Sequence, residues 1–118
     1  MIINGTHIGE IYSPYIIAEL SANHGGSLER AKMSIEAAAK CGVSAVKIQS
    51  YTPDTMTLNS DKNDFQIDQG IWKGYSLYEL YREAHTPFEW HDELFKHATK
   101  LGITIFSTPF DETAVDLL

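Results

Sequence analysis

The sequence predicts an α/β fold built around a parallel sheet. Three short apolar runs alternate with segments that have the spacing of amphipathic helices, and strands that alternate with helices imply parallel pairing. Ligands of such sheets bind at the carboxyl ends of the strands, so polar residues at these ends predict an enzyme. The three runs, each with the polar residues that follow it, are Tyr15–Ser21 with Asn23 and His24, Ala45–Ser50 with Tyr51 and Thr52, and Ile103–Thr108 with Pro109, Phe110 and Asp111.

Residues 1–14 are predicted to hold a short β-hairpin. Asn4-Gly5 stands between apolar flanks, and both central residues of a type I′ turn need a positive φ, which Asn and Gly tolerate. A hairpin that precedes the first strand of the sheet would close the amino-terminal end of the fold.

The first helix is predicted to begin after Ser27 as its N-cap and to end at Gly42. Lys40 lies near the negative end of its dipole, and the apolar stripe has helical spacing. The stripe comprises Leu28, Ala31, Ile35, Ala38 and Ala39.

A long connection, residues 52–75, follows the second strand and has no clear period, and long loops at this end of a strand tend to be functional. Ser76–Glu79 predicts a capping box for a helix over Leu77–Ala84. Thr86–Glu89 predicts a second capping box, with proline at the first helical position, for a helix that runs to about Leu101.

The chain has 118 residues, whereas a closed TIM (β/α)8 barrel takes eight strands and about 250 residues. Its last segment, Asp111–Leu118, starts like a helix and covers about two turns. We therefore expect residues 15–118 to be the first three βα units of such a barrel, preceded by the hairpin. The alternative is a complete small α/β domain.

Composition narrows the function classes. The net charge of −7 argues against nucleic-acid binding, which needs a basic surface. No apolar stretch is long enough to span a membrane, and Met1–His7 lacks the features of a signal peptide. The single Cys41 fits a reducing compartment, so a cytoplasmic location is expected.

Strand alternation predicts the inward-facing residues of the site. Lys47 and Gln49 share one face of the second strand, opposite an apolar pair that packs under helices. Glu19 and Thr108, on the neighbouring strands, are expected at the mouth of the same barrel interior. A parallel sheet is covered on both faces, so a lysine and a glutamate here need each other or a ligand. A purely structural Glu–Lys pair remains the alternative.

His24 follows the first strand and is a candidate general acid or base. The alternative is a turn histidine whose ring nitrogens are satisfied by hydrogen bonds to the backbone. His85, His91 and His97 are spaced by six residues and so do not share a helix face, and no metal site is predicted among them.

Three stretches together resemble the amino-terminal barrel motifs of the sialic acid synthase family: Ile17–Ser27, Ala45–Gln49 and Phe106–Asp111. The resemblance spans nearly the whole chain. It implies the condensation of phosphoenolpyruvate with an amino-sugar aldehyde to give a nonulosonic acid and phosphate. The stretch Trp72–His91 is similar to the subgroup that makes pseudaminic acid, with legionaminic and N-acetylneuraminic acids as alternative products.

The resemblance also implies residue roles. Glu19 matches the catalytic carboxylate and Lys47 a phosphoenolpyruvate-binding lysine, with Thr108 beside it as a donor to the same ligand. Gln49 and Phe110 match residues of the sugar pocket. Asn23 and His24 match the motif, and we expect Asn23 to bind substrate and His24 to join the catalysis.

A divalent metal ion, Mn²⁺ or Mg²⁺, is implied as a cofactor that polarises the aldehyde, with its ligands expected beyond Leu118 and none within this chain. A homodimer is implied as the assembly, without nucleic-acid or membrane partners.

Two other functions remain open. A Schiff-base aldolase would use Lys47 as its nucleophile. A chain that only folds or assembles would have no turnover.

Overall fold

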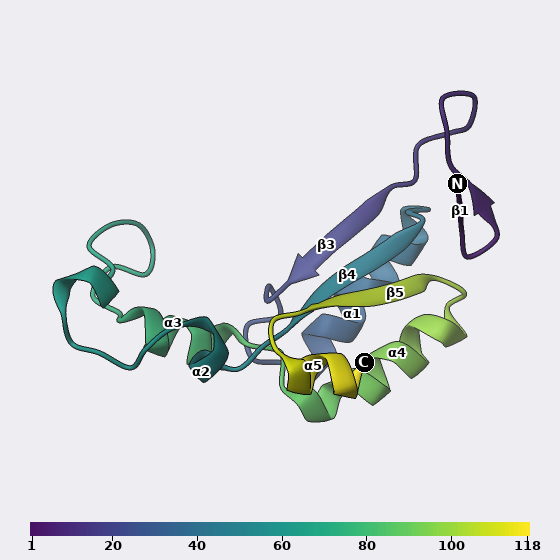
Figure 1. The fold of residues 1–118 in the computed structure, drawn as a ribbon. Coiled ribbons are helices and arrows are strands. Elements are labelled where there is room, and N and C mark those ends of the chain that lie inside the picture. Colours follow the sequence, from purple (N-terminus) through teal and green to yellow (C-terminus); the bar gives the residue numbers. More distant parts are fainter.

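The computed structural model describes residues 1–118, and in it two helices pack against one face of a three-stranded parallel sheet (Figure 1). The strands β3 (Ile17–Ser21), β4 (Ala45–Ser50) and β5 (Thr104–Pro109) lie in the order β3-β4-β5. The helices α1 (Leu28–Lys40) and α4 (His91–Lys100) cover one face of the sheet, and the other face is open (Figure 1). This confirms the predicted α/β class and the parallel sheet.

The amino-terminal hairpin forms as predicted. β1 (Ile2–Ile3) pairs antiparallel with β2 (Thr6–His7), and Asn4 and Gly5 take φ values of 45° and 80°, as both central residues of a type I′ turn require. The Asn4 amide donates a hydrogen bond of 2.9 Å to Thr104 Oγ1 at the start of β5. The hairpin is therefore tied to the amino-terminal end of the sheet, opposite the predicted site.

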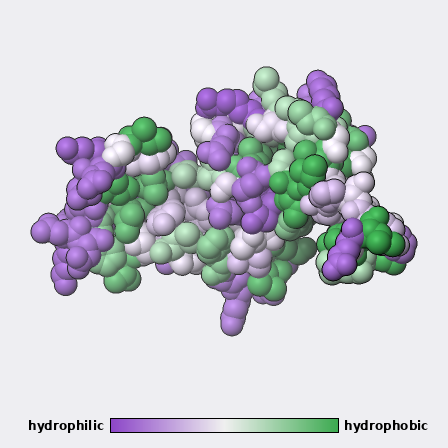
Figure 2. Space-filling model, turned by 90° about the horizontal axis from the view of Figure 1, so that it is seen from above, coloured by the Kyte–Doolittle hydropathy of each residue, from purple (hydrophilic) through white to green (hydrophobic).

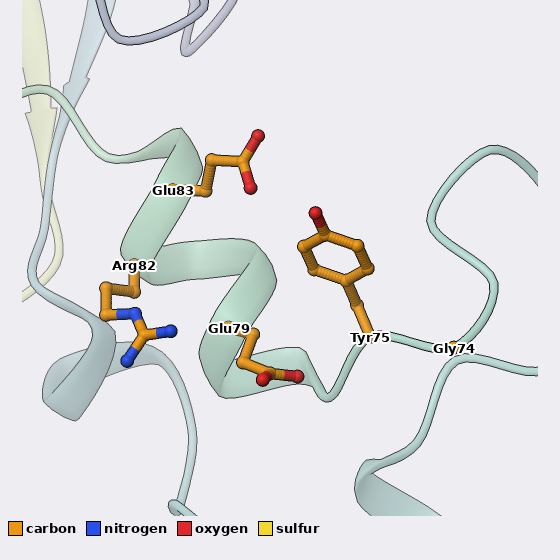
Figure 3. Close-up of a pocket in the computed structure, with 5 residues that line it drawn as sticks. All are labelled: Gly74, Tyr75, Glu79, Arg82 and Glu83. Carbon is orange, nitrogen blue, oxygen red and sulfur yellow. The ribbon is translucent and has the colours of Figure 1, made fainter.

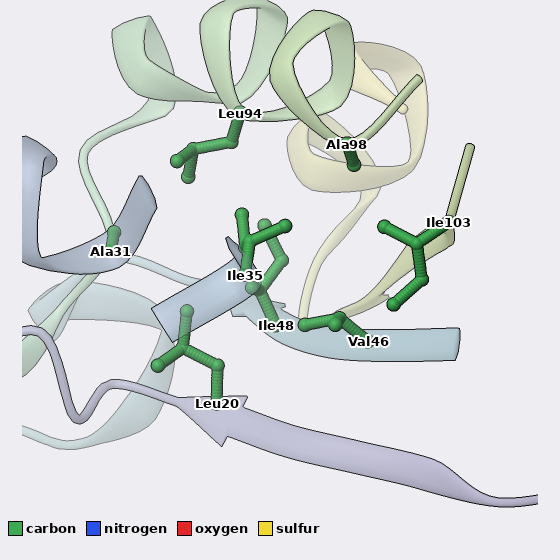
Figure 4. Close-up of a cluster of buried hydrophobic side chains, with 8 residues drawn as sticks. All are labelled: Leu20, Ala31, Ile35, Val46, Ile48, Leu94, Ala98 and Ile103. Atoms are coloured by element: carbon green, nitrogen blue, oxygen red, sulfur yellow. The ribbon is translucent and has the colours of Figure 1, made fainter. Parts of the chain in front are cut away.

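The core lies between the sheet and the two helices (Figure 4). Val46 and Ile48 of β4 are almost fully buried, which confirms the predicted apolar face of this strand. The buried cluster comprises Leu20, Ala31, Ile35, Val46, Ile48, Leu94, Ala98 and Ile103. Burial of a side chain of the size of valine or isoleucine stabilises a fold by about 1.5–3 kcal/mol, so this layer fixes the helices on the sheet.

The ends of α1 follow the prediction. The Ser27 hydroxyl accepts a hydrogen bond from the Arg30 N–H, which satisfies one of the free donors of the first turn. Gly42 has φ 74° just after the last turn, a conformation that favours glycine. The strand β4 can therefore begin three residues later.

The long connection over residues 52–75, which has no clear period in the sequence, contains two short helical turns. α2 (Pro53–Met56) follows Thr52, and the 3₁₀ turn η1 spans Asn63–Phe65. α3 (Leu77–Ala84) begins with the predicted capping box of Ser76 and Glu79. Together these elements form an arm, residues 52–85, that extends away from the sheet (Figure 1).

The second predicted capping box is wrong. Thr86 does not cap a helix: the 3₁₀ turn η2 (Phe88–Trp90) follows Pro87 without a side-chain cap, and α4 begins only at His91. The Thr86 hydroxyl lies against the His24 ring instead, because a buried histidine needs a hydrogen-bond partner there. After β5, Asp111 caps α5 (Glu112–Leu117) by accepting from the Ala114 N–H.

None of the helices is both long and apolar enough to cross a lipid bilayer.

Candidate active site

Two rows of side chains cross the open face of the sheet toward the carboxyl ends of its strands. In the first row, Glu19 of β3, Lys47 of β4 and Phe106 of β5 are paired across the strands. The Lys47 ammonium lies 2.7 Å from the Glu19 carboxylate. The alternation predicted from the sequence therefore holds, and the predicted carboxylate and lysine are neighbours.

The Glu19–Lys47 ion pair keeps contact with water. The side chains of Lys47 and Glu19 are 33% and 41% exposed, and pairs of this kind contribute only about 0–1 kcal/mol to stability. Lys47 is the only cation on the three strands. The pair is thus poorly explained by stability alone, and an anionic ligand can compete with Glu19 for the ammonium group.

The second row lies one step closer to the strand ends. Gln49 is paired with Thr108 across β4 and β5, and the Ser21 hydroxyl donates a hydrogen bond of 2.5 Å to the Gln49 side-chain oxygen. This fixes the orientation of the Gln49 amide and turns its N–H donors away from Ser21. Sequence analysis identified Gln49 and Thr108 but missed Ser21.

Ser21 reaches Gln49 because β3 is irregular at its end. The register of β3 against β4 shifts between Glu19 and Ser21, and Ser21 has φ 54°. Its N–H donates a hydrogen bond of 3.0 Å to Glu19 Oε1. Bulges and left-handed residues are common beside active sites, but a bulge leaves no signature in the alternation of a five-residue strand.

An aromatic cluster follows the strand ends. Phe110, just past β5, packs edge-to-face on Tyr51 with ring centroids 5.7 Å apart, and Tyr51 packs on Tyr81 of α3 at 5.8 Å. Tyr51 is nearly inaccessible, and burial raises the pKa of its hydroxyl. Phe110 is 39% exposed. It can therefore offer an apolar surface to a ligand while Tyr51 supports it from behind.

Asn23 and His24, in the turn after β3, differ in their exposure to solvent. Asn23 is exposed, and His24 is buried with both ring nitrogens in hydrogen bonds. His24 Nδ1 accepts from the Gly26 N–H at 3.2 Å, so its Nε2–H donates to Thr86 Oγ1 at 3.1 Å. These contacts favour the alternative of a structural turn histidine, although only one of its two partners is the expected backbone group and the other is the Thr86 side chain.

The pKa of His24 is lowered, first by burial and then by the positive charges of His85 and Arg30. Burial penalises the imidazolium, so the neutral ring with one donor and one acceptor is the stable form. Its surroundings therefore suit a neutral hydrogen-bonding role better than proton transfer to a ligand on the open face.

No three histidine, cysteine, aspartate or glutamate side chains of residues 1–118 lie close enough together to hold a metal ion. The residues of this chain therefore do not fit the implied metal by themselves, and no chemical step is assigned to a metal here. A divalent ion remains a prediction from the family resemblance.

A cleft of about 440 Å³ lies on the arm, beside α3, and not at the strand ends (Figure 3). Gly74, Tyr75, Glu79, Arg82 and Glu83 line it. The Tyr75 hydroxyl points toward the Glu83 carboxylate, whose negative charge raises the pKa of Tyr75 (Figure 3). The residues that line this cleft include none of the predicted site residues, so we place the candidate active site on the open face of the sheet.

Comparison with known proteins gives a consistent result. The sequence model of the NeuB family matches residues 34–118 of this chain. The chain is 58% identical over 104 residues to pseudaminic acid synthase of Campylobacter jejuni, covering 88% of this chain and 30% of that protein. It is 51% identical over 105 residues to pseudaminic acid synthase of Helicobacter pylori, covering 89% and 31%. The chain thus spans about 30% of the length of these relatives.

The fold has a similar relative among solved structures. An N-acetylneuraminic acid (sialic acid) synthetase from Leptospira borgpetersenii, in complex with citrate, superposes with a TM-score of 0.77 at 26% identity. The superposition covers all of this chain and 36% of that protein.

Proposed function

The chain belongs to the NeuB family, and from this premise we propose that it forms the first three βα units of a (β/α)8 barrel enzyme. The hairpin β1-β2 would close the amino-terminal end of this barrel, and the open face of β3-β4-β5 would face its interior. The parallel strand order and the superposition on a sialic acid synthetase support the proposal.

The proposed reaction joins phosphoenolpyruvate to an amino-sugar aldehyde, and pseudaminic acid is the first candidate for the product. The methylene carbon C3 of phosphoenolpyruvate attacks the aldehyde carbon, and the aldehyde oxygen takes up a proton. Water then adds to C2, the electron-poor carbon that carries the phosphate, and loses a proton; a second proton is lost as the C2–O bond to phosphate breaks and the keto group forms. The products are a nine-carbon 2-keto acid and inorganic phosphate.

The single observation that carries this proposal is the Glu19–Lys47 pair on the open face of a parallel sheet, in the row next to Gln49 and Thr108. Phosphoenolpyruvate is strongly anionic, and Lys47 is the cation available on the strands. When the ligand binds Lys47, the Glu19 carboxylate loses its partner and is placed to take a proton from the attacking water or to return it.

The second row would bind and orient the substrates. Thr108 is paired with Gln49, one row from Lys47, and its hydroxyl would donate to phosphoenolpyruvate. The Gln49 amide, oriented by Ser21, and the Phe110 ring would contact the sugar. Asn23, exposed in the turn after β3, is proposed to bind substrate from the rim.

The identity of the sugar rests on the relatives. Two pseudaminic acid synthases match at 58% and 51% identity, which favours that product over legionaminic or N-acetylneuraminic acid. It also favours a synthase over a chain that only folds or assembles. A dimeric state and a cytoplasmic location remain predictions.

The test uses the full-length protein that contains this chain. Phosphate release is measured with phosphoenolpyruvate and each amino-sugar precursor of the three acids in turn. We expect release only when both substrates are present, and fastest with the precursor of pseudaminic acid. Borohydride added during turnover separates the aldolase alternative, because a Schiff base on Lys47 would be trapped covalently. A trapped adduct on Lys47 would refute the synthase mechanism.

A further inference from the structure

A buried chain of hydrogen bonds lies beneath the ends of β4 and β5, on the helix-facing side of the sheet. The Ser107 and Ser50 hydroxyl oxygens are 2.6 Å apart, and Ser50 Oγ is 2.6 Å from His91 Nε2. Ser50 is inaccessible to solvent and His91 is 4% exposed. None of these three residues belongs to the proposed substrate site.

The contact between His91 and Pro87 fixes the donor and the acceptor of every hydrogen bond in this series. His91 Nδ1 lies 3.1 Å from the Pro87 carbonyl oxygen, which can only accept, so Nδ1 carries the proton. His91 Nε2 is then an acceptor and takes the Ser50 hydroxyl proton. The Ser50 oxygen in turn accepts from the Ser107 hydroxyl. With a neutral His91, this is the one arrangement of protons in which all three hydrogen bonds form.

A serine hydrogen-bonded to a histidine also occurs in nucleophilic catalysis. Here the serine has no exposed surface and its hydroxyl faces the helix layer rather than the open face. No substrate can reach it, so a nucleophilic role does not fit. The arrangement instead joins three elements: β4, β5 and the start of α4.

The two serines alternate with site residues along their strands. Ser50 follows Gln49 in β4, and Ser107 precedes Thr108 in β5. Successive side chains of a strand point to opposite faces, so the orientation of one residue restricts that of the next. Because Gln49 and Thr108 are paired across the strands, a hydroxyl bridge between Ser50 and Ser107 restrains both at once.

We propose that Ser107, Ser50 and His91 form a positioning relay that holds Gln49 and Thr108 in their substrate-binding orientation from the opposite face of the sheet. The inference rests on the proposed function for its kinetic meaning. The three residues act through their neighbours and touch no substrate.

Kinetics of the full-length protein test the relay. Ser50→Ala breaks both hydroxyl contacts, and we expect the KM values for phosphoenolpyruvate and the amino sugar to rise about ten- to a hundredfold, since small misplacements of binding groups are costly. The value of kcat should change much less, as expected when binding alone is lost. A purely structural role would instead reduce the amount of folded enzyme, which lowers the apparent kcat and leaves KM unchanged. Unchanged KM values in Ser50→Ala would overturn the proposal.

A rescue series examines the acceptor role of His91. The side-chain oxygen of His91→Gln lies near the place of Nε2 and can accept from Ser50, whereas His91→Leu offers no acceptor. We expect KM values close to those of the wild type in His91→Gln and raised values in His91→Leu. Equal KM values in the two variants would contradict the relay. Ser34→Ala and His97→Gln are matched controls, because Ser34 bonds its own helix and His97 lies against Glu36 of α1.

Hydrogen exchange measured by mass spectrometry separates failure of the relay from failure of the proposed function. Backbone amides of residues 47–50 and 105–109 should exchange faster in Ser50→Ala than in Ser34→Ala, whatever reaction the protein catalyses. Equal exchange would overturn the relay. Absence of turnover in the wild type would refute only the proposed function, and the exchange data would still decide the inference.

Discussion

At Ser21 the backbone has φ 54°, a conformation that residues with a side chain seldom adopt. The strain is compensated by two hydrogen bonds, from its N–H to Glu19 and from its hydroxyl to Gln49. One residue thereby connects both rows of the candidate site. Glu19 and Lys47 are the other two residues on which the proposed chemistry depends, and each carries a prediction.

Lys47→Ala should weaken phosphoenolpyruvate binding in the full-length protein. A hydrogen bond to a charged group contributes about 1.5–3 kcal/mol, so the KM for phosphoenolpyruvate should rise roughly ten- to a hundredfold. Lys73→Ala is the matched control, because Lys73 lies on the arm, outside the sheet. Steady-state kinetics over a range of phosphoenolpyruvate concentrations provide the measurement. An unchanged KM in Lys47→Ala would remove Lys47 from the site.

Glu19→Gln keeps the shape of the side chain and removes its charge. Turnover should fall by about 10²-fold or more, as expected for loss of a general acid or base. Phosphate release at saturating substrate gives kcat, and circular dichroism checks the fold. Near-normal turnover in a folded variant would assign Glu19 to a structural ion pair with Lys47. Glu29→Gln, on the exposed side of α1, serves as the control.

The two buried histidines predict loss of stability in acid. Burial is the main cause that lowers the pKa of both His24 and His91 from the ordinary 6.5. Below pH 6.5 these histidines take up protons in the unfolded chain but not in the folded chain. The contribution of the two neutral histidines to the free energy of unfolding is therefore fully present above this pH and is lost as the pH falls. The expected slope is up to about 1.4 kcal/mol per pH unit for each histidine.

Urea unfolding of the full-length protein between pH 7.5 and 5 measures this effect. His91→Gln should flatten the acid slope, because glutamine does not titrate. Ser34→Ala is the control, because serine does not titrate and Ser34 bonds only its own helix. Identical slopes in His91→Gln and the wild type would count against His91 as a source of the acid sensitivity.

Among the elements, the junction between α3 and α4 has the most unexpected structure. Thr86 accepts from His24 in the turn after β3, and His91 lies at the start of α4 with its ring against Ser50 of β4. The Trp90 ring also packs edge-to-face on His24, with centroids 5.3 Å apart. This six-residue junction, residues 86–91, therefore ties two strand ends to the helix layer.

Thr86→Val should destabilise the protein by about 1–3 kcal/mol, because the buried His24 N–H loses its acceptor and water cannot replace it. Thr99→Val is the control, since Thr99 is exposed and its hydroxyl bonds only the Phe95 carbonyl oxygen of its own helix. Chemical denaturation of both variants gives the difference. A Thr86→Val variant as stable as Thr99→Val would mean that the His24–Thr86 contact adds nothing.

On the scale of the whole molecule, the open face of the sheet determines how residues 1–118 behave as an isolated polypeptide. Ile17, Phe106 and Phe110 are 45%, 36% and 39% exposed there. Hydrophobic and hydrophilic patches lie side by side over the molecule seen from above (Figure 2). β3 and β5 also each have an unpaired edge in the sheet. Exposed apolar surface and free strand edges both favour association.

An isolated polypeptide of residues 1–118 should therefore self-associate at micromolar concentration. Sedimentation velocity measures the size distribution, and Phe106→Ser should shift it toward monomer because it removes apolar surface without touching the buried core. A monomer that unfolds cooperatively would contradict this expectation and would favour a complete small α/β domain.

The sequence predicted those helices and turns whose formation depends on residues close together in the chain. The Asn4-Gly5 turn, the Ser27 and Ser76 caps and the apolar stripe of α1 were confirmed because each depends on residues close together in the chain. The face shared by Lys47 and Gln49 was predicted for the same reason, since alternation is a local property of a strand. The Thr86–Glu89 capping box failed because a partner distant in sequence, His24, took the Thr86 hydroxyl.

The sequence by itself determined the class of fold and the strand face that Lys47 and Gln49 share, and it predicted the strand ends as the site. Only the tertiary structure decided the bulge at Ser21, the buried state of His24 and the hydrogen bonds that link Ser107, Ser50 and His91. The His24–Thr86 and Ser50–His91 contacts join residues 62 and 41 positions apart. Such contacts form only when helices and strands have packed, because burial removes water and leaves each polar atom to find its partner within the chain.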